Sequence, residues 1–295
     1  MSLRLTCALL LIVIATPTFA APIPAPIEDM LRAASPTDRK VVAKVAKATA
    51  TDSVTEIDAL VAALSAAETA EKQAALATQG FWDGWSGEGS LGGSFSTGNT
   101  EETGVSAGLA LEKRGVDWEH DLSFAADYLR TDGATRRERF YAGYTGRYDL
   151  SGDFFFAFGL LSFERDRFSG IDYRFTESLG AGYRLYDTDR FKWTIEGGPA
   201  LRQTSFTDGT DENKVDLLGR TDIDWQISDS FTLTERAGFV LSRGNSSYFA
   251  KTAATATVLG DLKARLSLDV LHETEPPAGR VKTDTITRAS LVYDF

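Results

Sequence analysis

The chain has 295 residues, a formal net charge of -11 at pH 7 and a single cysteine, Cys7. No cluster of Lys and Arg interrupts the acidic excess, and phosphate neutralisation needs such a cluster, so no nucleic-acid partner is expected. One cysteine cannot form an intrachain disulfide or a thiolate metal centre, and we expect no metal or cofactor.

Residues 1–20 are expected to be a secretory signal peptide. Arg4 precedes an apolar run that extends to Ala15, and small residues follow up to Ala20. This order of a basic start, an apolar core and a small-residue end predicts cleavage after Ala20. Cleavage there would also remove the only thiol.

Residues 21–80 are rich in Ala, Lys and Glu, and their apolar residues recur at helical spacing. Ser35–Pro36 is typical of an N-cap followed by the first residue of a helix. Ser53 with Glu56 is a capping-box pattern that indicates a further helix. Three valines are predicted to share one helical face: Val41, Val42 and Val45. We therefore expect a short α-helical region before the rest of the fold.

Residues 81–295 alternate between apolar and polar side chains, which is the period of a β-strand. Only "DFFFAFGLLSFERD", residues 153–166, is apolar on both parities. Twelve strands are predicted, at 84–97, 101–113, 116–130, 137–150, 153–166, 171–187, 191–203, 214–227, 231–242, 247–259, 262–274 and 282–295.

The connections between these strands alternate in length. Two-residue turns follow the even strands, whereas longer polar loops follow most odd strands, and the clearest are "TDGATRR", "SFTDGTDEN" and "ETEPPAGRVK". Successive hairpins of this kind predict an up-and-down meander with turns at one end and loops at the other.

The apolar face could point inward, as in a soluble β-protein, or outward toward lipid. The predicted strands are about twice as long as the five or six residues usual in soluble proteins. Their even number, the turn and loop asymmetry and the aromatic residues near strand ends are typical of outer-membrane barrels. We predict an all-β, 12-stranded antiparallel transmembrane β-barrel at 81–295 in the bacterial outer membrane, in contact with its lipid and lipopolysaccharide.

The end of the chain is predicted to close the barrel, because the last strand must pair with the first. Leu291, Tyr293 and Phe295 share the lipid-facing parity. We expect them to form the C-terminal signal that the barrel-assembly machinery recognises. In the alternative interpretation, Phe295 is only part of an aromatic girdle.

The opening "WSGEGSLGGSFSTGNT", the twelve-strand alternation and the closing "YDF" together resemble the YdiY-like family of salt-induced outer-membrane proteins, which carries a domain of unknown function. The resemblance covers residues 81–295. It implies an outer-membrane β-barrel of a Gram-negative bacterium, and it supplies no substrate and no catalytic residue.

Charged residues of both signs lie on the parity predicted to face the lumen. Hairpin geometry predicts that Asp127 lies opposite Arg139 and that Asp222 lies opposite Arg236. It also predicts that Asp121 lies diagonal to Arg147. The predicted lumen network is Asp117, Glu119, Asp121, Asp127, Arg137, Arg139, Arg147, Asp222 and Arg236. It could be a constriction that orients ions or small polar solutes, or an ion-pair network that fills a closed lumen.

An enzyme is not expected, because nucleophilic catalysis usually needs a histidine beside the nucleophile. The two histidines, His120 and His272, fall on the lipid-facing parity, and only Thr285 is a plausible hydroxyl neighbour of His272. A lipid-active enzyme is the weakest alternative.

An even strand count places both ends of the barrel on the short-turn side, which faces the periplasm. Residues 21–80 are therefore expected to be periplasmic, either as a simple helical cap or as the binding site for a periplasmic partner. The function hypotheses are a narrow passive pore, a closed barrel that stabilises the envelope, and an adaptor that acts through the helices.

Overall fold

The computed structural model describes residues 21–97, 102–131, 134–151, 154–276 and 281–295. The predicted signal peptide, 1–20, and its cleavage point at Ala20 lie outside the described residues. The chain divides between Ala74 and Ala75 into a helical unit and a β-barrel, and each is described by itself.

The helical unit contains α1 (Ala25–Ala33), α2 (Pro36–Thr49), a short 3-10 turn (Thr51–Ser53) and α3 (Val54–Ala77). Ser35 caps α2 as predicted, because its side chain accepts a hydrogen bond from the backbone N–H of Asp38. The fully or nearly buried apolar core consists of Leu31, Ala43, Ala46 and Ile57. Among the described residues, no helix is long and apolar enough to cross a membrane.

The predicted valine face of α2 holds for two of its three members, but these two lie on the exposed side of the helix. Val41 and Val45 are 65% and 56% exposed, and only Val42 packs against the core. The reason is Arg39, which is buried and turns its own side of α2 inward. Its guanidinium donates to the carbonyl oxygens of Leu31 and Ala34 and to Glu68 of α3, and so it ties the three helices together.

Ser53 directly precedes α3, as predicted, but its backbone N–H donates to the carbonyl oxygen of Ala50 and not to the Glu56 side chain as in a capping box. It lies in the 3-10 turn before the helix, and its hydroxyl donates to the carbonyl oxygen of Pro22. The hydroxyl therefore binds the segment before α1 across the unit.

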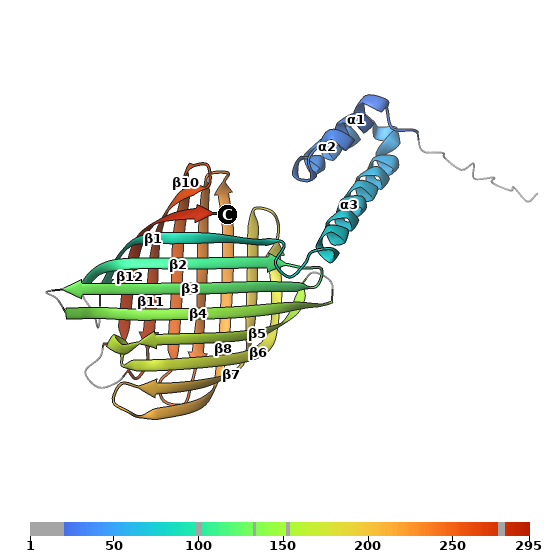
Figure 1. The fold of residues 1–295 in the computed structure, drawn as a ribbon. Coiled ribbons are helices and arrows are strands. Elements are labelled where there is room, and N and C mark those ends of the chain that lie inside the picture. Colours follow the sequence, from blue (N-terminus) through green and yellow to red (C-terminus); the bar gives the residue numbers. More distant parts are fainter. Residues whose placement is uncertain (1–20, 98–101, 132–133, 152–153, 277–280) are drawn as a thin grey trace, which may run out of the picture. The chain divides into compact units, whose positions relative to one another are not determined.

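Twelve antiparallel strands form one closed barrel in which each strand pairs with its neighbours along the chain (Figure 1). This confirms the predicted fold. The strands are β1 (Trp85–Thr97), β2 (Glu102–Arg114), β3 (Trp118–Thr131), β4 (Ala134–Ser151), β5 (Phe155–Asp166), β6 (Ile171–Asp187), β7 (Phe191–Phe206), β8 (Asp211–Ser228), β9 (Phe231–Leu241), β10 (Ser247–Leu259), β11 (Leu262–Glu273) and β12 (Thr283–Asp294).

Two of the predicted loops are mostly strand. β3 continues to Thr131 and β4 begins at Ala134, while β7 continues to Phe206 and β8 begins at Asp211. Polar residues can extend a ladder beyond the apolar band, and Gly209, at φ 85°, then allows the β7–β8 hairpin to close tightly. Only the connection between β11 and β12 stays long.

The outward parity carries exposed apolar side chains, with aromatic rings gathered at the turn end. Trp118 stacks on the ring of His120 at 5.9 Å and lies 4.9 Å from the ring of Tyr148. Trp193 stacks on Tyr186 at 6.1 Å. Such a band is typical of the membrane interface. Further outward residues that are exposed include Leu91, Val105, Leu109, Phe124, Leu161, Leu179, Val215, Leu217 and Leu266.

The barrel closes between β12 and β1. The backbone N–H of Phe295 donates to the carbonyl oxygen of Gly87 and the N–H of Gly87 donates to that of Phe295, both at 2.9 Å. The predicted pairing of the last strand with the first is therefore confirmed. Leu291, Tyr293 and Phe295 are exposed on the outward parity, and their role as an assembly signal stays a prediction.

Candidate functional site in the barrel lumen

Ion pairs between strands that are not neighbours identify the inward face. Arg147 on β4 binds Glu196 on β7 at 3.0 Å, and Arg288 on β12 binds Asp127 on β3 at 2.9 Å. Two strands separate the members of each pair around the wall. Side chains on a convex outer surface diverge, so these contacts form only through the interior. All residues in register with them also face the lumen.

One chain of ion pairs connects five strands across the lumen. Arg147 binds Asp121 and Glu196, and Glu196 is shared with Arg220. Arg220 in turn contacts Asp222 at 3.1 Å. In order, the chain is Asp121, Arg147, Glu196, Arg220, Asp222 and Arg236. The Glu196 side chain is fully buried, so its charge depends on both arginines.

Two smaller networks occupy other parts of the interior. Arg184 binds Glu119 at 3.0 Å and Asp149 at 2.7 Å. Arg139 on β4 and Arg174 on β6 both bind Glu164 on β5, at 3.0 and 3.5 Å. Opposite charges therefore alternate around much of the inner wall, with neither sign forming a continuous stripe.

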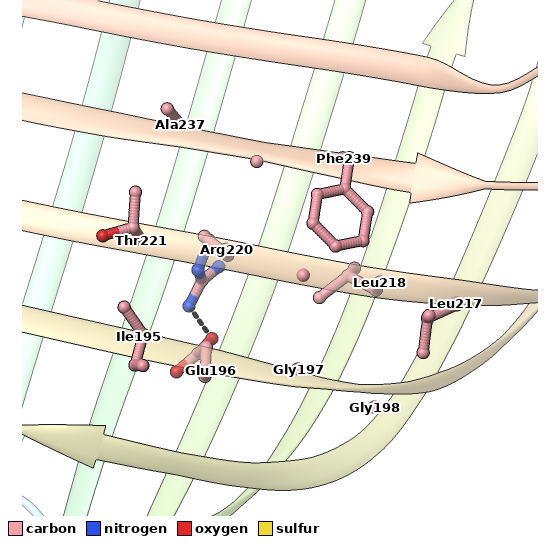
Figure 2. A pocket seen from close by; sticks show the side chains of 12 residues that line it. Ile195, Glu196, Gly197, Gly198, Leu217, Leu218, Arg220, Thr221, Ala237 and Phe239 are labelled. Atoms are coloured by element: carbon pink, nitrogen blue, oxygen red, sulfur yellow. Dashed lines mark ion pairs between the residues drawn. The ribbon is translucent and has the colours of Figure 1, made fainter.

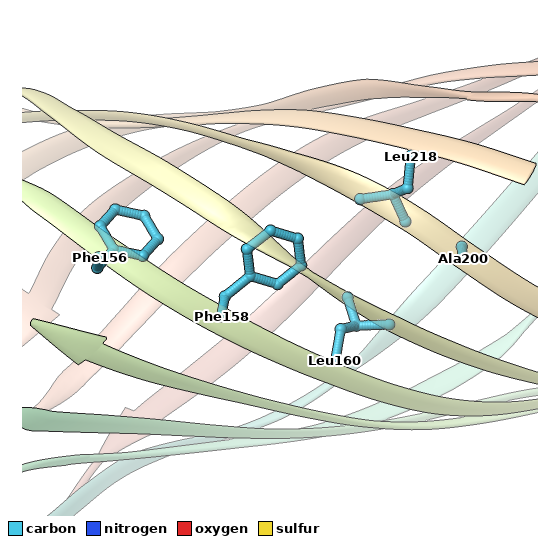
Figure 3. Packing of buried hydrophobic residues seen from close by; sticks show 5 residues of the cluster. All are labelled: Phe156, Phe158, Leu160, Ala200 and Leu218. Carbon is cyan, nitrogen blue, oxygen red and sulfur yellow. The ribbon is translucent and has the colours of Figure 1, made fainter. Parts of the chain in front are cut away.

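A cluster of apolar side chains also points into the lumen, and we call it the packed side. Its members are Phe156, Phe158 and Leu160 on β5, Ala200 on β7 and Leu218 on β8 (Figure 3). The Phe156 ring lies 4.9 Å from the guanidinium of Arg184 and 5.8 Å from that of Arg147, within cation–π range. The cluster explains why β5 is apolar on both parities.

Glycines on β6 make room for these rings. A Cβ at Gly182 would come within 2.2 Å of the Phe156 ring, and one at Gly180 within 2.6 Å of the Phe158 ring. The aromatic side chains therefore lie flat against the neighbouring strand, which thickens this part of the wall.

On other strands some inward side chains remain exposed, and we call the region around Arg236, Asp121 and Lys251 the hydrated side. The side chains of Arg236 and Asp121 are 58% and 39% exposed although both face the lumen. Further inward residues that are exposed include Glu112, Ala125, Asp224 and Lys251. The lumen is thus filled unevenly, with side chains packed against β5–β8 and accessible space beside β2, β3, β9 and β10.

Residues 89–295 match the model of a family described as "Protein of unknown function, DUF481". The chain belongs to this family. It is 23% identical over 211 residues to the "Uncharacterized protein YdiY" of Escherichia coli (strain K12), across 70% of this chain and 83% of that one. The resemblance to YdiY-like proteins seen in the sequence is confirmed.

Among solved structures, the NanC porin superposes on this DUF481 barrel with a TM-score of 0.50 and 10% identity, covering 70% of this chain and all of that one. The COG4313 outer membrane channel of Pseudomonas putida F1 gives a TM-score of 0.46 and 9% identity, covering 72% and 96%. The NanC likeness concerns the fold. Together with the apolar outward face and the aromatic band, it places the barrel in the bacterial outer membrane.

Most residues of the predicted lumen network face the interior of the DUF481 barrel. Asp222 lies opposite Arg236 and the two form an ion pair. Asp127 lies opposite Arg139, as expected from the hairpin, yet its carboxylate binds Arg288 through both oxygens. The predicted residues that form ion pairs inside the barrel are Glu119, Asp121, Asp127, Arg139, Arg147, Asp222 and Arg236.

Two predicted residues are not part of this network as described. Asp117 lies before the first residue of β3, in an exposed turn. Arg137 pairs with Leu129 through the register of β3 and β4, but its side chain lies outside the described residues. Both residues lie close to a strand end, where the alternation of inward and outward side chains is a weak guide to position.

Several residues of the site were missed, among them Glu88, Asp149, Glu164, Arg174, Arg184, Glu196, Arg220, Arg265, Asp269 and Arg288. Inward parity alone would have found each of them. Some of their partners, however, lie on strands that are not consecutive in the sequence, as when Arg265 on β11 binds Glu88 on β1. Hairpin geometry cannot predict such pairs.

The two histidines lie on the outer face of the barrel wall. The Nδ1 of His120 lies 2.9 Å from the hydroxyl of Tyr144 within the aromatic band. The Nδ1 of His272 lies 2.9 Å from the hydroxyl of Thr283, and not of Thr285 as predicted, because β12 pairs Thr283 with His272. Among the described residues, no group of three or more His, Cys, Asp or Glu is arranged to hold a metal ion.

A hollow of about 560 Å³ lies over β7, β8 and β9 (Figure 2). Small residues on the outward parity, Gly197, Gly219 and Ala237, leave the space, and Ile195 and Phe239 border it. Because these residues face the bilayer, an acyl chain would fill the hollow, and we do not assign it to the lumen.

Proposed function

We propose that this DUF481 barrel is a narrow passive route for ions or small polar solutes through the outer membrane. The route follows the hydrated side of the lumen. The supporting observation is the water exposure of Arg236 and Asp121, two charged side chains that point inward from opposite parts of the wall. Paired charges of both signs favour polar solutes without strong selection by sign.

Conductance of the purified full chain in planar bilayers tests this proposal. Steady single-channel steps are expected for the wild type. Ala125→Trp places a large ring on the hydrated side and should lower the conductance at least about twofold. The matched control is Ala126→Trp, at the next residue on the outward parity, which should leave the conductance unchanged.

Silence of the wild-type chain in bilayers would reject the pore and support the closed, envelope-stabilising barrel. Equal conductance of the two tryptophan variants would instead place the route elsewhere in the lumen. We further propose that the chain is not an enzyme, since neither histidine contacts both a hydroxyl nucleophile and a carboxylate within the part of the chain described.

A second candidate function is an adaptor that acts through periplasmic helices. Val41 and Val45 favour it, because they lie one turn apart on the exposed face of α2. Deleting residues 21–80 should leave bilayer conductance intact and abolish retention of any periplasmic partner. Contacts of the outward face with lipopolysaccharide, and of Leu291, Tyr293 and Phe295 with the assembly machinery, remain part of the same proposal.

A further inference from the structure

Two cationic side chains face each other directly across β9 and β10. Arg236 and Lys251 are register partners, and both belong to the inward parity. Like charges opposite each other in a sheet repel and destabilise the pairing. A nearby negative charge is therefore needed to offset the repulsion between the two side chains.

The carboxylates nearby only partly supply that charge. Arg236 uses its Nε to bind Asp222, which also contacts Arg220. Asp269 is the register partner of Lys251 on its other side, but it binds Arg288. Among the described residues, no carboxylate lies within ion-pair distance of the Lys251 ammonium.

Charged groups of both signs surround Lys251. Arg236, Arg265 and Arg288 act electrostatically on its ammonium, and so does the carboxylate of Asp269. Each of these arginines already holds a carboxylate of its own. Lys251 is therefore the one cation of this group that, among the described residues, has no carboxylate within ion-pair distance.

Space and donors are available at the same place. Lys251 is exposed to the lumen, and Arg236 keeps its two terminal nitrogens for a further partner while 58% of its side chain is exposed. The inward Phe249 lies next along β10, with its ring over Gly238. Across the lumen, Tyr141 and Asp121 come within electrostatic reach of Arg236.

We infer that Lys251 and Arg236 form a binding site for a small anionic group, a carboxylate or a phosphate, on a solute in the lumen. The planar fork of Arg236 would take two oxygens, and the ammonium of Lys251 would act as a point charge beside it. The ring of Phe249 offers an apolar contact for the rest of the solute. The inference rests on the proposed function, because the solute must reach the lumen.

Calorimetric titration of the detergent-purified full chain, with sodium phosphate in one arm and sodium acetate in the other, tests the site. Saturable heat in one arm alone identifies the anion class. Lys251→Gln should weaken binding about tenfold or more, since a charged hydrogen-bond partner is lost. Lys251→Arg should restore most of the affinity.

The control is Lys113→Gln, which makes the same change in charge on the outward parity, where the ammonium binds the carbonyl oxygens of Gly80 and Phe81. Its affinity should equal that of the wild type. Equal binding by wild type and Lys251→Gln, or no saturable heat in either arm, would overturn the inference.

Bilayer recordings separate this inference from the proposed function. Anion binding that depends on Lys251 in a chain that does not conduct would keep the site and reject the through-going route. Conductance without Lys251-dependent binding would keep the route and reject the site. If the chain conducts and also binds the anion through Lys251, then Lys251→Gln should shift the reversal potential in a salt gradient toward cation preference.

Discussion

The packed and hydrated sides of the lumen both consist of inward-facing residues, but they differ in how far water reaches these residues. On the packed side, Phe156 and Leu218 are buried and the Glu196 charge is enclosed between two arginines. On the hydrated side, Arg236 and Lys251 remain in contact with water. The difference teaches that inward residues of β5–β8 form a buried core, whereas charged residues on β9 and β10 keep contact with water.

The comparison also shows how part of the lumen of this barrel is filled. Twelve strands enclose more space than side chains of ordinary size fill. Here the rings of β5 and the transverse ion pairs fill part of that space. Changes on the two sides should therefore have different consequences.

Phe156→Ala is expected to have the largest effect. It removes a buried ring from the packed side and should lower the free energy of unfolding by about 4 kcal/mol. It should also raise single-channel conductance, because the freed space adds to the route. The outward neighbour Phe155 is 54% exposed, so Phe155→Ala should cost far less. Urea titration in micelles measures the first quantity, and equal losses for the two variants would contradict the comparison.

Arg147→Met should have the next largest effect. It leaves the buried Glu196 with only Arg220, and unpairing a buried charge costs about 3 kcal/mol. The matched change on the hydrated side, Arg236→Met, should cost about 1 kcal/mol or less because water and Arg220 still solvate Asp222. Thermal shift in a single detergent compares them. A larger loss for Arg236→Met would show that the two sides are not distinct.

Glu177→Leu should have the smallest effect, and its sign should be opposite. Glu177 is exposed on the outward parity of β6, between Leu161 and Leu201, where a carboxylate is unfavourable in lipid. Its replacement should stabilise the folded barrel by about 1 kcal/mol. Glu235 accepts a hydrogen bond from Thr252 on the same outer face, so Glu235→Leu should gain less. Refolding titrations into lipid vesicles provide the measurement, and a destabilised Glu177→Leu would mean that a partner covers this carboxylate.

The fold could be predicted from sequence because each strand shows its two faces through local alternation. Most strand ends were predicted within a few residues, as for Ile171–Asp187 and Leu262–Glu273. The largest errors were at β4, β7 and β8, where polar residues continue the ladder beyond the apolar band. Apolar periodicity carries no information about such extensions.

The site was less predictable, because lumen contacts depend on the curvature of the wall. Asp127 lies opposite Arg139, yet the Arg288 side chain reaches it across β1 and β2. The packed side could not be predicted because β5 is apolar on both faces. The local pattern therefore did not show which face points to lipid and which to the lumen. In α2, one buried arginine, Arg39, reversed the expected valine face.

The reciprocal hydrogen bonds between Gly87 and Phe295 have a consequence for biogenesis. The two strands at this seam lie about two hundred residues apart, so the wall can close only when β12 is present beside β1. A prematurely stopped product would expose an unpaired ladder at β1 and remain leaky or unsealed. Pairing of β12 with β1 therefore requires that all the intervening strands are present.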